Sequence, residues 1–176
     1  MALTVNRPEL LHDGKDENFR QTIHDALGFS VRLLEIRNGF AESISLTGPA
    51  FSILIAIDHL TKQDDIGISH VSEHLHQSGA FVTLEVAKLV KKGLIIKVPN
   101  RHDRRRVSLS VTQKATDLLA KLAATQRPVN DAIFSKLDAD QCASFADIIK
   151  KLLIGTDEGL ALLNYFNERR RNQAAE

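Results

Sequence analysis

The chain has few residues that could cross-link it and no segment suited to a membrane. Tryptophan is absent from its 176 residues, and cysteine, methionine and tyrosine occur once each. Because Cys142 is the single cysteine, an internal disulfide is excluded and no second thiol could resolve a sulfenic acid. We expect it to pack as a small hydrophobe on a carboxy-terminal helix. No apolar run approaches the roughly 20 residues that cross a bilayer, and residues 1–8 lack the apolar core of a signal peptide. We therefore expect a cytoplasmic protein with no membrane partner.

Motifs for catalysis are also missing. The sequence has no glycine-rich phosphate loop, no nucleophile elbow and no pair of carboxylates in a strand-loop setting. We expect neither an enzyme nor a bound cofactor. With 43% hydrophobic and 26% charged residues, the composition fits one compact domain with an extension.

Two short helices separated by a tight turn are predicted in the middle of the chain. The first spans residues 69–75, with Ser69 as its cap. The second spans residues 78–92, with Ser78 as its cap and Gly93 as its terminator. The apolar stripes consist of Val71 and Leu75 in the first helix and of Val82, Val86 and Leu89 in the second. This order of elements predicts a helix-turn-helix.

A pair of β-strands is predicted directly after the second helix. Residues 94–98 are mostly β-branched or otherwise apolar, and residues 107–111 alternate strictly between apolar and polar side chains. The segment 99–106 between them begins with Pro99 and is rich in arginine, which is typical of an exposed hairpin tip. The two strands therefore predict a wing beside the helix-turn-helix.

Positive charge is concentrated in this part of the chain. The formal net charge of the whole chain is only +1, whereas residues 86–106 carry a net +7, with Asp103 as their single acid. A polyanion favours such a concentration through counterion release, and an arginine-tipped hairpin suits the narrow minor groove. A solvated charged loop is the alternative, but it is less common at the tip of a hairpin that follows a helix-turn-helix. The pattern favours binding of double-stranded DNA.

These residues resemble the MarR/SlyA family of winged-helix transcriptional regulators, and the resemblance spans most of the chain. Residues 103–105 are similar to the D-x-R signature of the family's wing, and residues 111–112 to its following L-T step, with valine in place of leucine. Residues 89–95 are similar to the end of the recognition helix and its exit into the wing. The resemblance implies a homodimer that places two recognition helices in successive major grooves of a palindromic operator. It also implies repression that a small ligand relieves.

The resemblance further implies roles for single residues. Arg105 is expected to reach the minor groove, and Asp103 to hold the hairpin tip through charge-assisted hydrogen bonds. Phosphate contacts are expected from Arg101, Arg104 and Arg106. The residues expected to face DNA on the recognition helix and at its start are Gln77, Ser78, Gly79, Ala80, Phe81, Thr83, Leu84 and Lys88.

This recognition face is unusually apolar. Base edges are mostly read by Arg, Lys, Asn and Gln, and the helix itself offers only Thr83 and Lys88. Either Ala80, Phe81 and Leu84 contact thymine methyl groups, or sequence is read through the shape of the groove. An alternative is a winged helix used as a protein-interaction module, with Phe81 and Leu84 facing outward. The four arginines of the tip favour DNA, because they have no evident purpose at an apolar contact.

Histidines offer another alternative, a zinc-responsive regulator. His70 and His74 are four positions apart on the first helix of the motif, with His59 and His76 as further candidates. A histidine pair on a solvated helix face is more often surface than ligand. We therefore expect no metal site.

The two ends of the chain are expected to form an all-α dimerisation domain. A helix over residues 18–43 has two nearly opposite apolar faces, and two faces need two partners, either another element of the same domain or a second subunit. The faces consist of Ile23, Leu27, Val31 and Leu34, and of Phe29, Leu33, Ile36 and Phe40. Because the tail supplies more helix than one winged domain can use, the second subunit is favoured.

The tail of the chain is expected to be helical almost throughout. Thr112 caps a helix that Pro128 kinks or divides, Asp138 begins the next helix, which ends at Gly155, and Thr156 caps the last one. The expected fold is mainly α with a small β-wing. Its parts are an arm and dimerisation helix in residues 1–44, a winged helix-turn-helix lobe in 45–112, and helices that complete the dimerisation domain in 113–176.

A small-molecule effector is expected in the crevice between the dimerisation helices and the winged lobe. Arg37 could pair with a carboxylate, Phe40 and Phe51 could enclose an aromatic ring, and His59 could donate a hydrogen bond. Phe40 and Phe51 also fit a hydrophobic core, and Arg37 also fits a surface charge. These four residues are the candidates for binding an aromatic acid.

Overall fold

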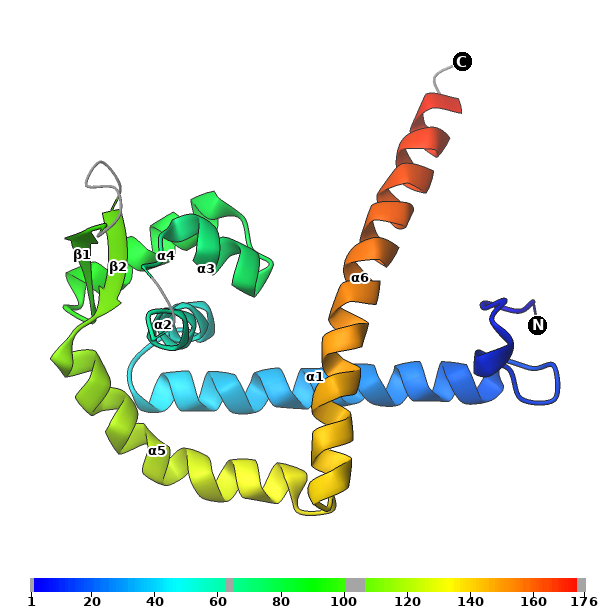
Figure 1. The fold of residues 1–176 in the computed structure, drawn as a ribbon, viewed down its shortest axis with the longest axis horizontal. Coiled ribbons are helices and arrows are strands. Elements are labelled where there is room, and N and C mark those ends of the chain that lie inside the picture. Colours follow the sequence, from blue (N-terminus) through cyan, green and yellow to red (C-terminus); the bar gives the residue numbers. More distant parts are fainter. Residues whose placement is uncertain (1, 63–64, 101–106, 174–176) are drawn as a thin grey trace. The chain divides into compact units, whose positions relative to one another are not determined.

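The computed structural model describes residues 2–62, 65–100 and 107–173. Among them, helices dominate and a two-stranded antiparallel sheet accompanies them, which confirms the predicted fold class (Figure 1). In chain order the elements are the 3-10 helix η1 (Pro8–Leu10), α1 (Glu17–Ser43), α2 (Gly48–Leu60), α3 (Ile68–Leu75), α4 (Gly79–Lys91), β1 (Ile95–Pro99), β2 (Val107–Val111), α5 (Gln113–Phe134) and α6 (Ala139–Gln173).

The chain divides into two compact units, residues 1–126 and 127–176. The division falls within α5, so this helix contributes to both units. The boundaries predicted after residues 44 and 112 stay a prediction.

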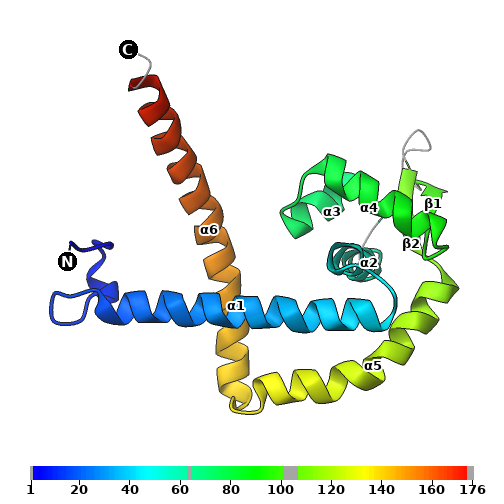
Figure 2. The ribbon, with the colours of Figure 1, turned by 180° about the vertical axis from the view of Figure 1, so that it is seen from behind.

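Helix α2 forms the centre of the first unit. It begins after Thr47, whose hydroxyl oxygen accepts a hydrogen bond from the amide of Ala50 at 3.3 Å. α1, α3, α4 and β2 all pack against α2, and Figures 1 and 2 show it between α1 and the pair α3 and α4. Its buried side chains are Ala50, Phe51, Ile53, Leu54, Ala56 and Ile57. Because α2 is covered on several sides, it positions both the helix-turn-helix and the wing.

α1 and α2 meet at a sharp turn. Ser45 adopts the left-handed conformation, with φ +56°, and the amide of Leu46 donates to the carbonyl of Ala41 at 2.9 Å. The axes of the two helices differ by 87°. By length and composition, none of the described helices alone could cross a membrane, and only α1 and α2 taken together pass that test.

The wing is tied to the segment that precedes the helix-turn-helix. β1 and β2 pair in antiparallel register over the whole of both strands. The amide of Leu109 in β2 also donates to the carbonyl of Ile66, ahead of α3, at 2.8 Å. The strands predicted at 94–98 and 107–111 are therefore confirmed, the first of them displaced by one residue.

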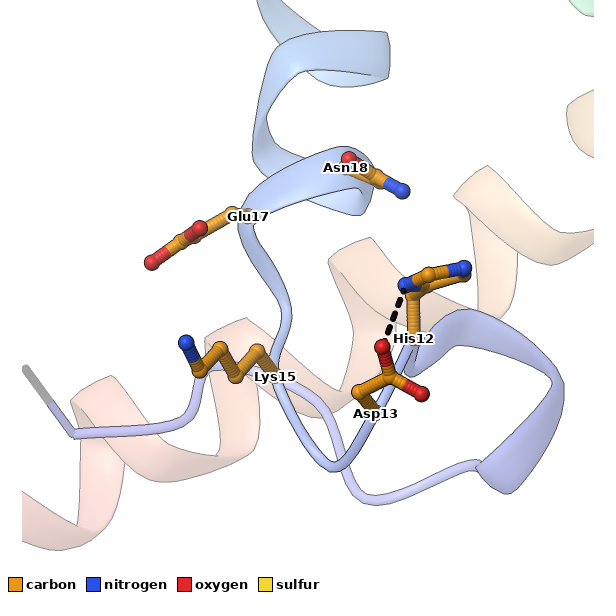
Figure 3. Close-up of a pocket in the computed structure, with 5 residues that line it drawn as sticks. All are labelled: His12, Asp13, Lys15, Glu17 and Asn18. Atoms are coloured by element: carbon orange, nitrogen blue, oxygen red, sulfur yellow. Dashed lines mark ion pairs between the residues drawn. The ribbon is translucent and has the colours of Figure 1, made fainter.

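The amino-terminal arm folds against the start of α1. The carboxylate of Asp16, a residue only 4% exposed, accepts hydrogen bonds from the amide and hydroxyl of Thr4 at 2.7 and 2.6 Å and from Arg20 at 3.0 Å. These hydrogen bonds, first from Thr4 and then from Arg20, hold the pKa of the Asp16 carboxyl far below its usual range. Because the pKa is lower in the folded state, this contribution to stability is present at neutral pH and is lost only in strong acid. In the preceding turn, Nδ1 of His12 lies 3.4 Å from Oδ2 of Asp13. Both residues line a cavity of about 170 Å³ (Figure 3).

Helix α5 begins where the sequence predicts it. The hydroxyl oxygen of Thr112 accepts a hydrogen bond from the amide of Ala115 at 3.2 Å. The helix then runs through Pro128 to Phe134, so the proline does not divide it. Of the two outcomes predicted for Pro128, division is wrong.

Most of the second unit is one helix of 35 residues, α6. Its start is as predicted, because the carboxylate of Asp138 accepts from the amide of Gln141 at 2.8 Å and the Gln141 side chain accepts from the amide of Asp138 at 3.0 Å. The predicted break is wrong, since the helix continues through Gly155. Thr156, expected as a cap, instead donates its hydroxyl to the carbonyl of Leu152 at 2.7 Å.

Helices α1 and α6 each expose several large apolar side chains. On α1, the face toward α2 becomes buried near Phe40, whereas Leu27 and Leu34 on the other face are 57% and 60% exposed. No described residue of α6 is buried, and Cys142, expected to be packed, is exposed. The exposed apolar side chains of α6 include Ile148, Leu152, Leu153, Ile154, Leu160, Leu162, Leu163, Tyr165 and Phe166. No element among the described residues buries these faces.

Candidate nucleic-acid interface

The helix-turn-helix consists of α3, α4 and the tight turn between them. His76 ends α3 in the left-handed conformation, with φ +50°, and the hydroxyl of Ser72 donates to the carbonyl of Gln77 at 2.5 Å. Ser78 caps α4 as predicted, because its hydroxyl oxygen accepts from the amide of Phe81 at 3.3 Å. The turn therefore fixes the direction in which α4 leaves α3.

Replacing Ser78 with alanine should destabilise α4. The alanine variant loses the acceptor for an amide of the first turn, and we expect the free energy of unfolding to fall by about 1 kcal/mol. Ser78→Gly should cost only a few tenths of a kcal/mol, because water reaches the freed amide more easily there. Urea unfolding curves of the wild type and the two variants, all recorded at the same protein concentration, measure the difference in the free energy of unfolding. Equal losses in both variants would argue against the cap.

The start of α3 differs from the prediction. Gly67 is its N-cap, and Nδ1 of His70 accepts a hydrogen bond from the amide of Gly67 at 3.0 Å. Ser69 lies inside the first turn, so the predicted serine cap is wrong. His74 stacks on His59, with ring centroids 5.9 Å apart. Within the described residues, no group of three or more His, Cys, Asp or Glu side chains could hold a metal ion.

The buried side of α4 contains an acid that the sequence analysis missed. Val82, Val86 and Leu89 are buried as predicted, and so is Glu85, at 4% exposure. Oε1 of Glu85 lies 2.5 Å from Nζ of Lys88, one helical turn further on. The side chain of Lys88, expected to face DNA, is 54% exposed, and its ammonium group is paired with this buried acid. The spacing of an acid and a base three positions apart was the signal in the sequence.

The opposite side of α4 is exposed and carries no acid. Leu84 is 57% exposed, and a Cβ added at Gly79 would meet nothing within 4 Å, so the start of this side is open. Lys91 was not among the residues predicted to face DNA, although it continues the same helical spacing. The exposed residues of this side are Ala80, Thr83, Leu84, Ala87 and Lys91.

Phe81 does not lie on that exposed side. It is half-buried and lines a cavity of about 480 Å³ together with Leu34 and Arg37 of α1. The structure therefore does not bring Phe81 and Leu84 together into one outward apolar patch. The helix wheel alone gives no reason for this, because the direction of Phe81 depends on the space that α1 and α2 leave.

This cavity, called the Arg37 cavity below, lies between α1, α2 and the helix-turn-helix. The guanidinium of Arg37 lies over the ring of Phe51, 5.4 Å from its centroid, and within 3.5 Å of the hydroxyl of Ser52. Of the four residues predicted to bind a ligand, only Arg37 lines the cavity. Phe40 and Phe51 belong to the core, at 7% and 0% exposure, and His59 is an exposed residue that stacks on a histidine of α3.

The structure describes the two strands of the wing but not the tip between them. Lys97 is exposed on β1, and Nδ2 of Asn100 donates to the hydroxyl of Ser108 at 2.9 Å where the strands approach the tip. The tip residues expected to contact DNA lie outside the described residues, and their roles stay predictions. They are Arg101, Asp103, Arg104, Arg105 and Arg106.

The helix-turn-helix, its wing and the flanking helices define a winged-helix protein. No model of a protein family matches the chain. The chain is 28% identical over 121 residues to the HTH-type transcriptional regulator PapX of Escherichia coli, and the aligned part covers 68% of this chain and 74% of PapX. It is 25% identical over 118 residues to the HTH-type transcriptional repressor MdtR of Bacillus subtilis (strain 168), and the aligned part covers 67% of this chain and 76% of MdtR.

Solved structures agree on the fold. A MarR/EmrR family transcriptional regulator from Acinetobacter sp. ADP1 matches with a TM-score of 0.66 at 16% identity, over 79% of this chain and 96% of that one. The MepR–DNA complex of S. aureus matches with a TM-score of 0.59 at 15% identity, over 85% of this chain and 99% of that one. The chain thus has the winged-helix fold of the MarR-family regulators, and the resemblance to them is confirmed.

Proposed function

We propose that this protein is a transcriptional regulator that binds double-stranded DNA as a homodimer, with α4 in the major groove and the wing over the neighbouring minor groove. The observation that carries the proposal is the setting of α4, which α2 holds from one side while the other side stays exposed and free of acids. PapX and MdtR bear the names of transcriptional regulators, and MepR was solved with DNA. Two copies related by symmetry would require a palindromic operator, and the name of MdtR favours repression.

The exposed side of α4 favours reading by close approach rather than by long polar side chains. Its first residues are small, and Gly79 and Ala80 leave room for the backbone to approach the groove. Leu84 is exposed enough to contact a thymine methyl group, and groove shape would supply further selectivity. The protein-interaction alternative loses support, because Phe81 lines a cavity instead of extending the patch.

Homodimer formation is supported by the apolar faces of α1 and α6. A monomer rarely exposes contiguous apolar surface on this scale, and such surface marks an interface. Leu27 and Val31 on α1 are 57% and 64% exposed, and Leu152 and Leu163 on α6 are 58% and 51% exposed. A second copy of the chain offers the same faces and is therefore the simplest partner.

Lys91→Ala should weaken binding to DNA, whereas Lys88→Ala should have little effect. Lys91 is exposed on the outward side of α4, while Lys88 is paired with the buried carboxylate of Glu85. If Lys91 contacts one phosphate, its loss should reduce the slope of log affinity against log salt by about 0.9. Fluorescence anisotropy with one labelled duplex of arbitrary sequence, measured over a range of salt concentrations, gives this slope. A larger change for Lys88→Ala than for Lys91→Ala would contradict the proposed orientation of α4.

We also propose the Arg37 cavity as the site of a small effector, an aromatic acid. Its volume of about 480 Å³ is suitable for such a ligand, Arg37 provides a cation for a carboxylate, and Phe81 provides an aromatic wall. The walls also include Gln77, from the turn of the helix-turn-helix. A ligand in the cavity would therefore contact the DNA-binding motif directly and could shift it relative to α1 and α2.

Benzoate serves as the probe for this site. It should raise the melting temperature of the wild-type protein, and Arg37→Gln should weaken benzoate binding at least about tenfold, because a charge-assisted pair is lost. His59→Ala is the matched control, since His59 does not line the cavity, and it should bind benzoate as the wild type does. Calorimetric titration measures both variants. Two results would contradict the assignment: a loss of benzoate binding in His59→Ala, or benzoate binding by Arg37→Gln that is as tight as that of the wild type.

A further inference from the structure

The two polar side chains expected to read bases from α4 are both bound within the protein. The hydroxyl of Thr83 donates to the carbonyl of Gly79 at 2.7 Å, one turn earlier in the same helix. Nζ of Lys88 is paired with the buried carboxylate of Glu85. Lys91 is also exposed, but it lies in the last turn of α4, where the proposed contact is to a phosphate. The hydroxyl proton of Thr83 is therefore not free to donate to a base.

Methyl groups make up most of the exposed side of α4. Because the hydroxyl of Thr83 binds back to the helix, its γ-methyl group is the free end of this exposed side chain. Leu84 beside it is 57% exposed. Ala80 and Ala87 lie one turn before and one turn after these residues and are also exposed. The four positions have the spacing of a single helical face, so a partner of this face meets methyl groups.

The major groove of DNA holds one apolar group that such a face can contact. Thymine carries a methyl group at C5, and cytosine does not. The two pyrimidines also differ in the exocyclic group next to it, which is an acceptor oxygen in thymine and a donor amino group in cytosine. Reading this second difference requires a polar side chain at the base, and the hydroxyl of Thr83 is already used. The face can therefore detect the methyl group but not the exocyclic group.

We propose that the exposed side of α4 recognises the C5-methyl groups of pyrimidines, with Thr83 and Leu84 as the residues that determine specificity. At the positions they contact, 5-methylcytosine takes the place of thymine, because both bases carry the methyl group at C5. This recognition depends on the proposed entry of α4 into the major groove and specifies the chemical group that is read there. A duplex without these methyl groups still binds through its phosphates, so the two proposals fail separately.

Duplexes that differ in a single methyl group test the proposal on the wild-type protein. A duplex that the protein selects from random DNA is synthesised with uracil in place of thymine, one position at a time, and its affinity is measured by fluorescence anisotropy. Uracil keeps every hydrogen-bonding group of thymine and lacks its methyl group. At a contacted position, its loss should weaken binding roughly fourfold. Cytosine paired with guanine should bind no better than uracil there, and 5-methylcytosine should bind about as tightly as thymine.

Two variants of Thr83 separate its methyl group from its hydroxyl. Thr83→Ser keeps the hydroxyl and loses the methyl group, so the ratio of thymine to uracil affinity should fall to near one at the position that Thr83 contacts. Thr83→Val keeps a methyl group and loses the hydroxyl, so the ratio should stay near that of the wild type. Leu84→Ala should lower the ratio at a neighbouring position, because most of the exposed apolar side chain is removed.

Three results would overturn the proposal. The first is equal affinity of the wild type for thymine and uracil at every position, which leaves the proposed binding to DNA standing. The second is that 5-methylcytosine binds no better than cytosine. The third is a ratio that is kept in Thr83→Ser and lost in Thr83→Val, which would assign recognition to the hydroxyl. If the protein binds no duplex at all, the proposed function fails and this inference fails with it.

Discussion

Replacing both Leu152 and Leu163 with glutamate should convert the protein from dimers to monomers. The two leucines lie three helical turns apart on one face of α6 and are 58% and 51% exposed in the single chain. Burial of one leucine side chain contributes roughly 1.5–3 kcal/mol, and a two-fold dimer would bury four of them. Even a partial loss of about 4 kcal/mol raises the dissociation constant roughly a thousandfold. Sedimentation velocity over a range of concentrations measures the change.

The matched control adds the same charges to another face of α6. Ala161→Glu with Asn172→Glu also introduces two acids three helical turns apart, at positions that are exposed in the single chain. This control should remain dimeric. A dimer that persists in the leucine variant, or that is lost equally in both variants, would contradict α6 as the dimer interface.

Arg105→Ala should lower affinity for operator DNA by about 1–3 kcal/mol, which is a factor of roughly 5 to 150. Arg105 lies outside the described residues, and its role comes from the sequence, which puts it in a tip with a high local positive charge. A guanidinium in the narrow minor groove is favoured by the negative potential there. Fluorescence anisotropy measures the affinity, and the salt slope should fall by about one phosphate equivalent if the role is purely electrostatic.

Arg105→Lys separates charge from shape. Lysine keeps the positive charge but lacks the planar guanidinium, so the salt slope should stay near that of the wild type while part of the affinity is lost. If Arg105→Ala binds as tightly as the wild type, the wing has no part in recognition. Specificity would then rest on α4 alone.

The sequence predicted those elements whose ends are set by local chemistry. Ser78, Thr112 and Asp138 cap helices as expected, and Gly93 ends α4 with φ +69°. Each of these signals acts within one turn of the backbone. The wing followed from the alternation in residues 107–111, although burial in β2 does not follow it, since Val107 is exposed and Ser108 is buried.

The errors arose at residues that often end or begin a helix but whose effect is small compared with the stability of the helix around them. A glycine inside a helix costs only about 1 kcal/mol, so Gly155 does not stop α6 when apolar residues continue on both sides. Thr156 satisfies its hydroxyl by bonding back to Leu152 and need not begin a new helix. Pro128 removes one backbone hydrogen bond, which α5 tolerates.

The candidate site was predictable in outline but not in the direction of its side chains. Periodicity gives the outward side of α4, but it does not show that Phe81 lines a cavity or that Lys88 pairs with a buried acid. Those outcomes depend on how α1 and α2 pack against α4, which no local pattern records. The ligand residues failed to converge for the same reason, since Phe40 and Phe51 were needed for the core.

Selection of bound sequences from random duplex DNA by the purified full-length protein tests the central claim most directly. A dimer that inserts one α4 helix into each of two successive major grooves should enrich an inverted repeat whose half-sites lie about 10 base pairs apart, centre to centre. Enrichment of a single unsymmetrical site, or of no sequence at all, would contradict a dimeric DNA-binding regulator.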